Sequence, residues 1–412
     1  MIAQKERDIL RELANKYKEL AMLPQNQERI SRIRRINGLI PDRPIVWIDE
    51  IPWHEMDIEG QLTIQCENVQ AQKMERFFRE MIFRWKYFQA DMVLQPVYFI
   101  NKNFHNTGIG VLKEDDILST DSKNNIVSHS YKDVLKNPED LDKLRLPIVT
   151  ADKAADADEI NFAEEILSDI LPVKLRGHHI TWTPWDDISM LRGVEPILFD
   201  TILRPEFLHQ IISRFAEIAC SYMEQMEEQD LLDFNTGSLH CTPPWTDDLP
   251  ASDYDGGKVR LKDVWFRGTA QMFNSISPEM HEILDIEYMR PLSDRCGLVY
   301  YGCCEPLHDR LDMLKKLPNL RKVGVSPWAD IHASAEGLGK SYVYARKPNP
   351  AFVAGQIDNK VIESEIRETI ETCIANQCPY EFVLKDISTV SHKPENLIEW
   401  NRIVQKTIDE YY

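Results

Sequence analysis

"GLVYYGCCEPLHDRLDMLKKL", residues 297–317, joins a short apolar run to a segment with leucines at helical spacing. The run at 297–302 is rich in valine and tyrosine, which favours a β-strand. The leucines after it recur every three or four residues, which predicts a helix with one buried face. Pro306 suits the first position of that helix, where its missing N–H is not needed. The stretch therefore predicts one strand-to-helix unit.

The same alternation of strand and helix recurs from about residue 90 onward. Strands are predicted at 91–100, 173–182, 230–236, 265–273, 297–302, 320–326, 341–346 and 381–388. Strands separated by helices indicate a parallel sheet covered by helices, and eight strands close a (β/α)₈ barrel. We expect an α/β protein of the TIM-barrel class, with residues 1–90 as a helical segment packed on a barrel at 91–412. A doubly wound open sheet is the alternative, but no glycine fingerprint for a dinucleotide follows any strand.

The composition is that of a globular protein. The chain has 412 residues, 43% hydrophobic and 28% charged, with 48 basic against 67 acidic side chains and a net charge of −19. That charge argues against nucleic acids and anionic membranes as partners. No apolar run reaches the ~18–20 residues that cross a bilayer, and the first residues lack the apolar centre of a signal peptide. We therefore expect a cytoplasmic protein whose eight cysteines are thiols, metal ligands or nucleophiles rather than disulfides.

Two adjacent cysteines stand where the active site of such a barrel would lie, at the C-terminal end of a strand. Cys303 and Cys304 follow the strand at 297–302 and precede the predicted helix. The positive end of a helix would lower the pKa of a thiol there and favour the thiolate, which is both a nucleophile and a zinc ligand. Because successive residues leave a strand in opposite directions, we expect one thiol to face the pocket, and the sequence does not say which. The alternative is two small buried apolar residues.

A second cluster lies in "TGSLHCTPPW", residues 236–245, where His240 follows a predicted strand and precedes two prolines. Imidazole and thiolate together prefer zinc, and a catalytic zinc site needs three protein ligands. Cys303 and His240 would supply two of them. The candidates for the third are Cys241, Cys304, Glu305 and Asp386. The alternative for His240 is a hydrogen-bonded loop histidine.

Polar and aromatic side chains that follow other strands are candidates for substrate binding. They are Trp182, Arg267, Gln271, Trp328 and Lys347. Indole rings in loops suit a flat or methylated ligand, and basic groups suit a carboxylate. Core or capping contacts are the alternative for the tryptophans.

Several segments resemble the uroporphyrinogen decarboxylase superfamily. They are "RGVEPILFDTILRPEFLHQIISRFAE" (192–217), "ISPEMHEILDIEYMRPL" (276–292), "YYGCCEPLHDRLDMLKKLPNLRKVGVSP" (300–327), "SYVYARKPNPAFV" (341–353) and "HKPENLIEWNRIV" (392–404). The resemblance covers roughly residues 160–410 and implies a (β/α)₈ barrel. It implies either decarboxylation of uroporphyrinogen, or methyl transfer between a small methylated compound or thiol and a corrinoid protein, with zinc as Lewis acid.

Two departures from the family pattern bear on that choice. The arginine-rich signature of the decarboxylases should lie near the first strand, but "QPVYFINKNFHNTGIG" (95–110) contains no arginine. The methyltransferases carry a His-x-Cys pair after the strand that here ends in "YYGCC", and a further Cys after the last strand. Only Cys303 matches that pattern. Tyr301 stands in place of the His, and Lys385 or Asp386 in place of the later Cys.

We predict from the resemblance a corrinoid-dependent methyltransferase. Tyr301 or His179 would donate a proton to the departing atom, and Glu305 is a further catalytic candidate. Zinc would be held by a set drawn from Cys303, Cys304, His240 and Asp386. The expected partners are a small methyl donor or acceptor and a corrinoid protein. One alternative is a metal-independent decarboxylase or lyase whose carboxylated substrate is bound by Arg267, Arg346 and Lys347, and another is a ligand-binding member without catalysis.

Overall fold

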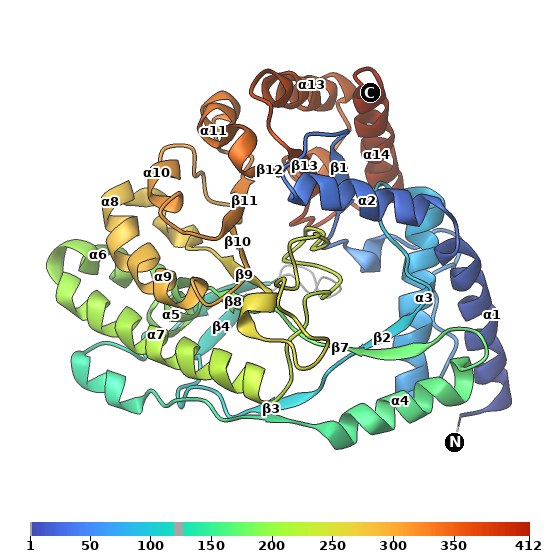
Figure 1. Ribbon diagram of the computed structural model, residues 1–412, viewed down its shortest axis with the longest axis horizontal. Helices are drawn as coiled ribbons and strands as arrows, with labels where there is room; N and C mark the ends of the chain where they lie inside the picture. Colours follow the sequence, from blue (N-terminus) through green and yellow to red (C-terminus); the bar gives the residue numbers. More distant parts are fainter. Residues whose placement is uncertain (1, 119–126) are drawn as a thin grey trace.

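A seven-stranded parallel sheet forms the frame of the protein (Figure 1). The computed structural model describes residues 2–118 and 127–412. The strand order is β1 (Ile45–Ile48), β13 (Tyr380–Leu384), β12 (Val343–Arg346), β11 (Leu320–Val325), β10 (Leu298–Tyr301), β9 (Trp265–Gly268) and β8 (Ile180–Trp182). Three two-stranded sheets accompany it: parallel β2 (Tyr98–Asn101) with β7 (Val173–Arg176), antiparallel β3 (Phe104–Asn106) with β6 (Val149–Ala151), and antiparallel β4 (Asp115–Leu118) with β5 (Ser128–Tyr131).

The helices lie mostly around the outside of the strands (Figure 1). They are α1 (Gln4–Ala21), α2 (Gln25–Asn37), α3 (Val69–Tyr87), α4 (Lys153–Leu167), α5 (Pro184–Arg192), α6 (Val194–Leu203), α7 (Pro205–Glu228), α8 (Pro278–His281), α9 (Glu287–Ser293), α10 (Leu311–Leu314), α11 (Ile331–Leu338), α12 (Ala351–Ala354), α13 (Asn359–Ala375) and α14 (Pro394–Asp409). A π-helical turn at Glu282–Ile286 joins α8 to α9. None of the described helices combines the length and apolarity that crossing a membrane requires.

The expected α/β class with a parallel sheet is confirmed. Closure into an eight-stranded ring is not shown by the described strands. The sheet ends at β1 on one side and at β8 on the other, and the β2–β7 pair is hydrogen-bonded to neither edge. A single parallel bridge joins His178 to Leu232. The closed barrel therefore stays a prediction.

The first 90 residues contribute a strand as well as helices. All four residues of β1 are buried, and the strand pairs in parallel with β13. Ile33 and Ile36 of α2 pack in one apolar cluster with Trp47 of β1 and Val343 of β12. Helices α1, α3 and α4 share a separate apolar cluster. The division of the chain at residue 90 stays a prediction, but β1 is part of the sheet itself.

Alternation along the strands sends successive side chains to opposite faces of the sheet. Phe266 of β9 and Tyr301 of β10 belong to the large cluster under the helices. Trp265 and Tyr300, one residue earlier in each strand, belong to a different cluster with Leu239. The segment around Leu239 therefore lies on the inner face, opposite the helical layer.

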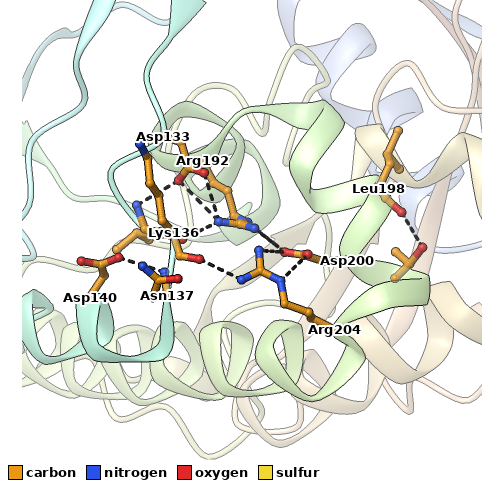
Figure 2. Close-up of polar contacts among 10 residues, drawn as sticks. Asp133, Lys136, Asn137, Asp140, Arg192, Leu198, Asp200 and Arg204 are labelled. Atoms are coloured by element: carbon orange, nitrogen blue, oxygen red, sulfur yellow. Dashed lines mark hydrogen bonds and ion pairs between the residues drawn. The ribbon is translucent and has the colours of Figure 1, made fainter.

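A buried network of charged groups joins α5, α6 and α7 to the loop at 133–137 (Figure 2). Arg192 at the end of α5 is buried, and its guanidinium pairs with Asp200 of α6 and with Asp133, the latter at 3.2 Å. The Nε of Arg204 donates to the same Asp200 carboxylate at 2.8 Å. Arg192 also donates to the carbonyl of Leu135 at 2.6 Å. The carboxylate of Asp200 thus binds two arginines, Arg192 at the end of α5 and Arg204 just before α7.

Replacement of Asp200 by alanine is expected to lower the free energy of unfolding by about 3 kcal/mol, because it leaves the buried charge of Arg192 without its main partner. Urea denaturation measures the loss. The control is Glu399→Ala, which removes an exposed pair with Arg402 and should cost under about 1 kcal/mol. Equal losses in the two variants would show that the network adds nothing to stability.

Candidate active site

The site begins at Gly302, the residue after β10. Its backbone φ of 111° is one that glycine adopts without strain, and a Cβ there would lie 2.8 Å from the side chain of Leu307. The chain then turns, and α10 begins only at Leu311. The prediction of a helix from Pro306 is therefore wrong, because the residues before Leu311 form turns. No helix N-terminus lies at Cys303 to stabilise its thiolate.

Both sulfurs of the cysteine pair lie on the same side of this turn. The two Sγ atoms are 3.6 Å apart, with Cys303 3% exposed and Cys304 half-buried. The two side chains do not point in opposite directions, because the turn at Gly302 interrupts the alternation of the strand, and which thiol faces a pocket stays a prediction. The Sγ of Cys304 donates to Oδ2 of Asp386 at 2.9 Å. The one proton of this thiol is within reach of both the Asp386 carboxylate and the sulfur of Cys303.

Nitrogen donors surround the sulfur of Cys303. The Nε2 of His240 lies 3.1 Å from it and the Nζ of Lys385 lies 3.5 Å from it. The Nζ of Lys347 donates to the backbone carbonyl of Cys303 at 2.6 Å. Among the described residues, no carboxylate oxygen is in hydrogen-bond contact with this sulfur. The surroundings therefore favour a negative charge on Cys303.

The pKa values follow from these contacts. The hydrogen bond from Cys304, with those from His240 and the charges of Lys347 and Lys385, lowers the pKa of Cys303 far below that of an ordinary thiol, although burial opposes the shift. The thiolate of Cys303 and burial raise the pKa of Cys304, which stays protonated. Burial alone would lower the pKa of Lys385, but the two sulfurs and Asp386 raise it. The pair thus carries one negative charge, on Cys303, beside one lysine ammonium.

His240 reaches Cys303 from a tight turn with unusual backbone angles. Leu239 and Thr242 exchange two backbone hydrogen bonds, of 2.8 and 3.3 Å, around His240 and Cys241. These two residues have φ values of 43° and 67°, which match a type I′ turn that usually takes Asn-Gly. Each such residue costs about 1–3 kcal/mol. The hydroxyl of Thr242 anchors the turn by donating to buried Glu381 at 2.6 Å. A strained, anchored turn therefore fixes the imidazole against the thiolate.

A second group of titratable side chains surrounds Arg267 at the end of β9. Arg267 is 3% exposed, its Nε and Nη2 atoms are buried without hydrogen-bond partners, and it forms no ion pair with a described residue. Burial and the charge of Arg267 lower the pKa of His179 to about 4. Burial raises the pKa of Asp186 to about 6 against the opposing charge of Arg267, and Gln271 donates to this carboxylate at 3.4 Å. Near neutral pH, His179 is uncharged and Asp186 exchanges its proton readily.

Replacement of Arg267 by methionine is expected to raise the free energy of unfolding by about 1–4 kcal/mol, because methionine fills similar space without an unpaired charge. Urea denaturation of the ligand-free protein measures the change. The matched control is Arg346→Met, since Arg346 is equally buried but pairs with Glu365 at 2.6 Å. That variant should lose stability. A loss in both variants would mean that Arg267 has a partner charge in the folded protein.

Two of the side chains singled out from the sequence lie in a buried network on the helix side of the sheet. The hydroxyl of Tyr301 donates to Asp285 at 2.7 Å and lies 2.7 Å from Nε2 of His281. The indole N–H of Trp182 donates to the other oxygen of Asp285 at 2.9 Å. Burial raises the pKa of Tyr301 far above that of an ordinary tyrosine. The structure places both side chains behind the strands rather than beside Cys303.

Glu305 stabilises the turn that carries Cys303 and Cys304. Its Oε2 accepts the backbone N–H of Cys303 at 2.9 Å, and its Oε1 accepts the hydroxyl of Thr269 at 2.5 Å. Both oxygens are thus used to position the loop. Trp328 is 68% exposed, on the surface after β11.

The side chains around the cysteine pair include residue types that bind zinc. His240, Cys303, Cys304 and Asp386 have the right chemistry, and consecutive members are 3.1, 3.6 and 2.9 Å apart. The ammonium of Lys385, however, lies 3.5 Å from Cys303 and 2.8 Å from Asp386, where it supplies the positive charge itself. Across residues 2–118 and 127–412, no three His, Cys, Asp or Glu side chains are arranged to hold a metal ion. The residues do not fit zinc in this arrangement, and the cofactor stays a prediction that metal analysis decides.

Two members of the site were not assigned a role from the sequence. Lys385 was noted only as standing where the family has a cysteine, yet its ammonium contacts both sulfurs. Asp186 lies in the first turn of α5, where an acidic residue is usual and attracts no notice. The one sequence signal that could have pointed to Lys385 is a lysine at the end of an apolar strand, as in "EFVLKDIS".

Comparisons with known proteins add one likeness. No protein-family model matches the chain, and no curated protein matches it either. Among solved structures, the chain is similar to a methyltransferase from Methanosarcina mazei, with 11% identity, a TM-score of 0.49, and coverage of 93% of this chain and 99% of that one. A likeness at this score carries no argument about chemistry, so the function must be argued from the site.

Proposed function

We propose that the protein is a methyltransferase in which the thiolate of Cys303 takes up the methyl group. The observation that carries the proposal is the donor set around its sulfur, with His240 at 3.1 Å and Lys385 at 3.5 Å. A thiolate is a soft nucleophile suited to attack on a methyl carbon. Here the charge is stabilised by fixed donors, so the nucleophile is ready before the substrate arrives.

The transfer is an in-line displacement. A bond forms between the Cys303 sulfur and the methyl carbon, while the bond from that carbon to the oxygen, nitrogen or sulfur of the donor breaks with its electron pair. Asp186, whose pKa burial raises to about 6, gives a proton to the departing atom. His179, with its pKa lowered to about 4, stays neutral and is too weak a base to take this proton. Lys347 holds the loop by its carbonyls and keeps the sulfur in place.

The second substrate in the proposal is a corrinoid held by a separate protein. This part rests on the resemblance of the 192–217, 276–292 and 300–327 segments to the uroporphyrinogen decarboxylase superfamily, for which corrinoid-dependent methyl transfer is one of two implied chemistries. The corrinoid belongs to the partner, so it acts on this chain as a substrate. Zinc enters no step, because Lys385 already provides a positive charge beside both sulfurs.

Methylcob(III)alamin, incubated with the purified protein without oxygen, tests the proposal in a single turnover. The thiolate should take the methyl group, and the electron pair of the broken bond should stay on cobalt as cob(I)alamin, seen by its absorbance. Peptide mass spectrometry should find one added CH₂ on the peptide with Cys303. Folded protein that never gains this mass would contradict the proposal. Metal analysis of the same sample decides the zinc prediction.

One observation favours a second function, a metal-independent decarboxylase or lyase acting on a carboxylated metabolite. Arg267 has no ion pair among the described residues and could bind a carboxylate. The other two cations of that hypothesis are engaged, since Arg346 pairs with Glu365 and Lys347 binds backbone carbonyls. Release of CO₂ from a carboxylic acid by the Cys303→Ala variant would support this function over methyl transfer.

A further inference from the structure

A cavity of about 420 Å³ lies between the end of β1 and the β2–β7 pair, where the seven-stranded sheet stops. Its walls come from α1, α3, the ends of β1, β2 and β7, and the loop at 236–245. Cavities of this size hold small-molecule ligands. None of the residues that line it belongs to the cysteine cluster, so it is a separate hollow of the fold.

Two arginines line this cavity without ion pairs to described residues. Arg84 of α3 is buried, donates through Nη2 to the carbonyl of Ile48 at 2.8 Å, and has no partner for Nε. Arg176 at the end of β7 donates through Nη2 to Gln95 at 3.1 Å, and its buried Nε also lacks a partner. Burial lowers the pKa of both guanidinium groups, but arginine keeps its charge in proteins. Asp49 and Asp233 act on these cations from a distance, but neither carboxylate is in ion-pair contact with them. Two guanidinium groups against the one carboxylate of the wall, Asp49, favour an anion there.

The remaining polar groups of the wall point to the same kind of ligand. The indole N–H of Trp245 is buried without a partner, which adds a third unused donor. Gly237 has a φ of 80°, and a Cβ on it would lie 2.4 Å from Nη1 of Arg176. A glycine at this position is therefore what lets Arg176 enter the cavity. An excess of unpaired donors calls for a ligand rich in acceptors, such as a carboxylate.

The apolar part of the wall is aromatic. The rings that line the cavity are Tyr17, Trp47, Phe77, Phe99 and Trp245. The guanidinium of Arg176 lies over the ring of Phe99, 3.6 Å from its centroid. Flat rings around a cationic end favour a planar ligand with one anionic group.

The cavity also touches the loop that carries His240. Ser238 lines it and donates to Asp49, another wall residue, at 3.5 Å. His240 follows Ser238 by two residues and contacts the sulfur of Cys303. A ligand in the cavity therefore lies against the strained turn of the candidate active site.

We propose that this cavity binds a small aromatic carboxylate, with its carboxylate at Arg84 and Arg176 and its ring among the aromatic side chains. The assignment does not rest on the proposed function, because the binding needs neither Cys303 nor a methyl group. Asp49 provides an acceptor for a donor group elsewhere on the ligand.

Isothermal titration of the full chain with benzoate tests the proposal, with benzamide and acetate as matched probes. Benzoate should bind, and benzamide, which lacks the charge, and acetate, which lacks the ring, should bind roughly tenfold or more weakly. Arg176→Met should weaken benzoate binding roughly tenfold or more, whereas Arg402→Met on the surface should not change it. If the methionine variant does not fold, Arg176→Lys, which keeps the charge, replaces it in the titration.

Equal binding of benzoate and benzamide, no binding of benzoate, or full binding by Arg176→Met would overturn the assignment. Cys303→Ala should keep benzoate binding while losing the methyl group. A protein that binds benzoate but never becomes methylated would thus refute the proposed function alone. A protein that is methylated on Cys303 but ignores benzoate would refute the cavity assignment alone.

Discussion

Replacement of Cys303 by alanine is expected to lower the rate of methyl transfer by about 10³-fold or more, the usual consequence of removing a nucleophile. Alanine leaves His240 and Lys385 in place but gives the methyl group nothing to bond to. The substitution removes a single sulfur atom, so the fold should stay intact. The rate is measured with methylcob(III)alamin as the appearance of cob(I)alamin.

Two further variants are the controls for Cys303→Ala. Cys220→Ala removes a half-buried thiol of α7, far along the chain from the turn, and should leave the rate unchanged. Cys304→Ala removes the neighbouring thiol, which stays protonated, and should transfer the methyl group, although more slowly. A Cys303→Ala variant as active as the wild type would exclude Cys303 as the methyl acceptor.

Replacement of Lys385 by methionine is expected to raise the pKa of Cys303 by about one to three pH units, because an opposite charge within ~4–6 Å has an effect of that size. The ammonium lies 3.5 Å from the sulfur and 3% of its side chain is exposed, so solvent screens it little. The labelling curve of the variant should therefore move to higher pH by the same one to three units. Labelling with iodoacetamide at a series of pH values, with peptide mapping, measures the change for Cys303 alone.

Lys385→Arg keeps the charge and is the matched control, with an expected labelling curve close to that of the wild type. Asp386 also binds Lys385, at 2.8 Å, so Asp386→Asn tests the opposite direction. Without this carboxylate, Lys385 still interacts with the thiolate of Cys303. The pKa of Cys303 should therefore not rise. Identical curves for Lys385→Met and the wild type would show that the lysine does not stabilise the thiolate.

Much of the framework could be predicted from the sequence because its pattern is local. The apolar residues of α7 and α13 recur at helical spacing, a pattern that predicts helices, and the structure has helices there. The strands β9 to β12 fall inside the predicted runs, and β13 begins one residue before its run. β1 was missed, since a four-residue apolar run in a helical region has no period to reveal it.

The sequence predicted which residues belong to the site better than it predicted how they are arranged. The sequence singled out Cys303 and His240, and the structure brings them into contact. The reason given for a low thiol pKa, a helix beginning at Pro306, is wrong, since turns precede α10. The positive φ angles of His240 and Cys241 leave no trace in residue types, because neither is glycine or asparagine. Contacts across 63 or 82 positions of the chain depend on how the strands pair, which a single sequence does not state.

The most direct test of the account is the pH dependence of iodoacetamide labelling at Cys303 in the wild-type protein. Since nearby donors and lysines hold the pKa of this thiol far below its usual value, the rate should stay level from about pH 5 to pH 8, where the thiolate is already fully formed. Cys304 should stay unlabelled over the same range. A rate that instead rises about tenfold with each pH unit up to about 8.5, as for an ordinary thiol, would contradict the account.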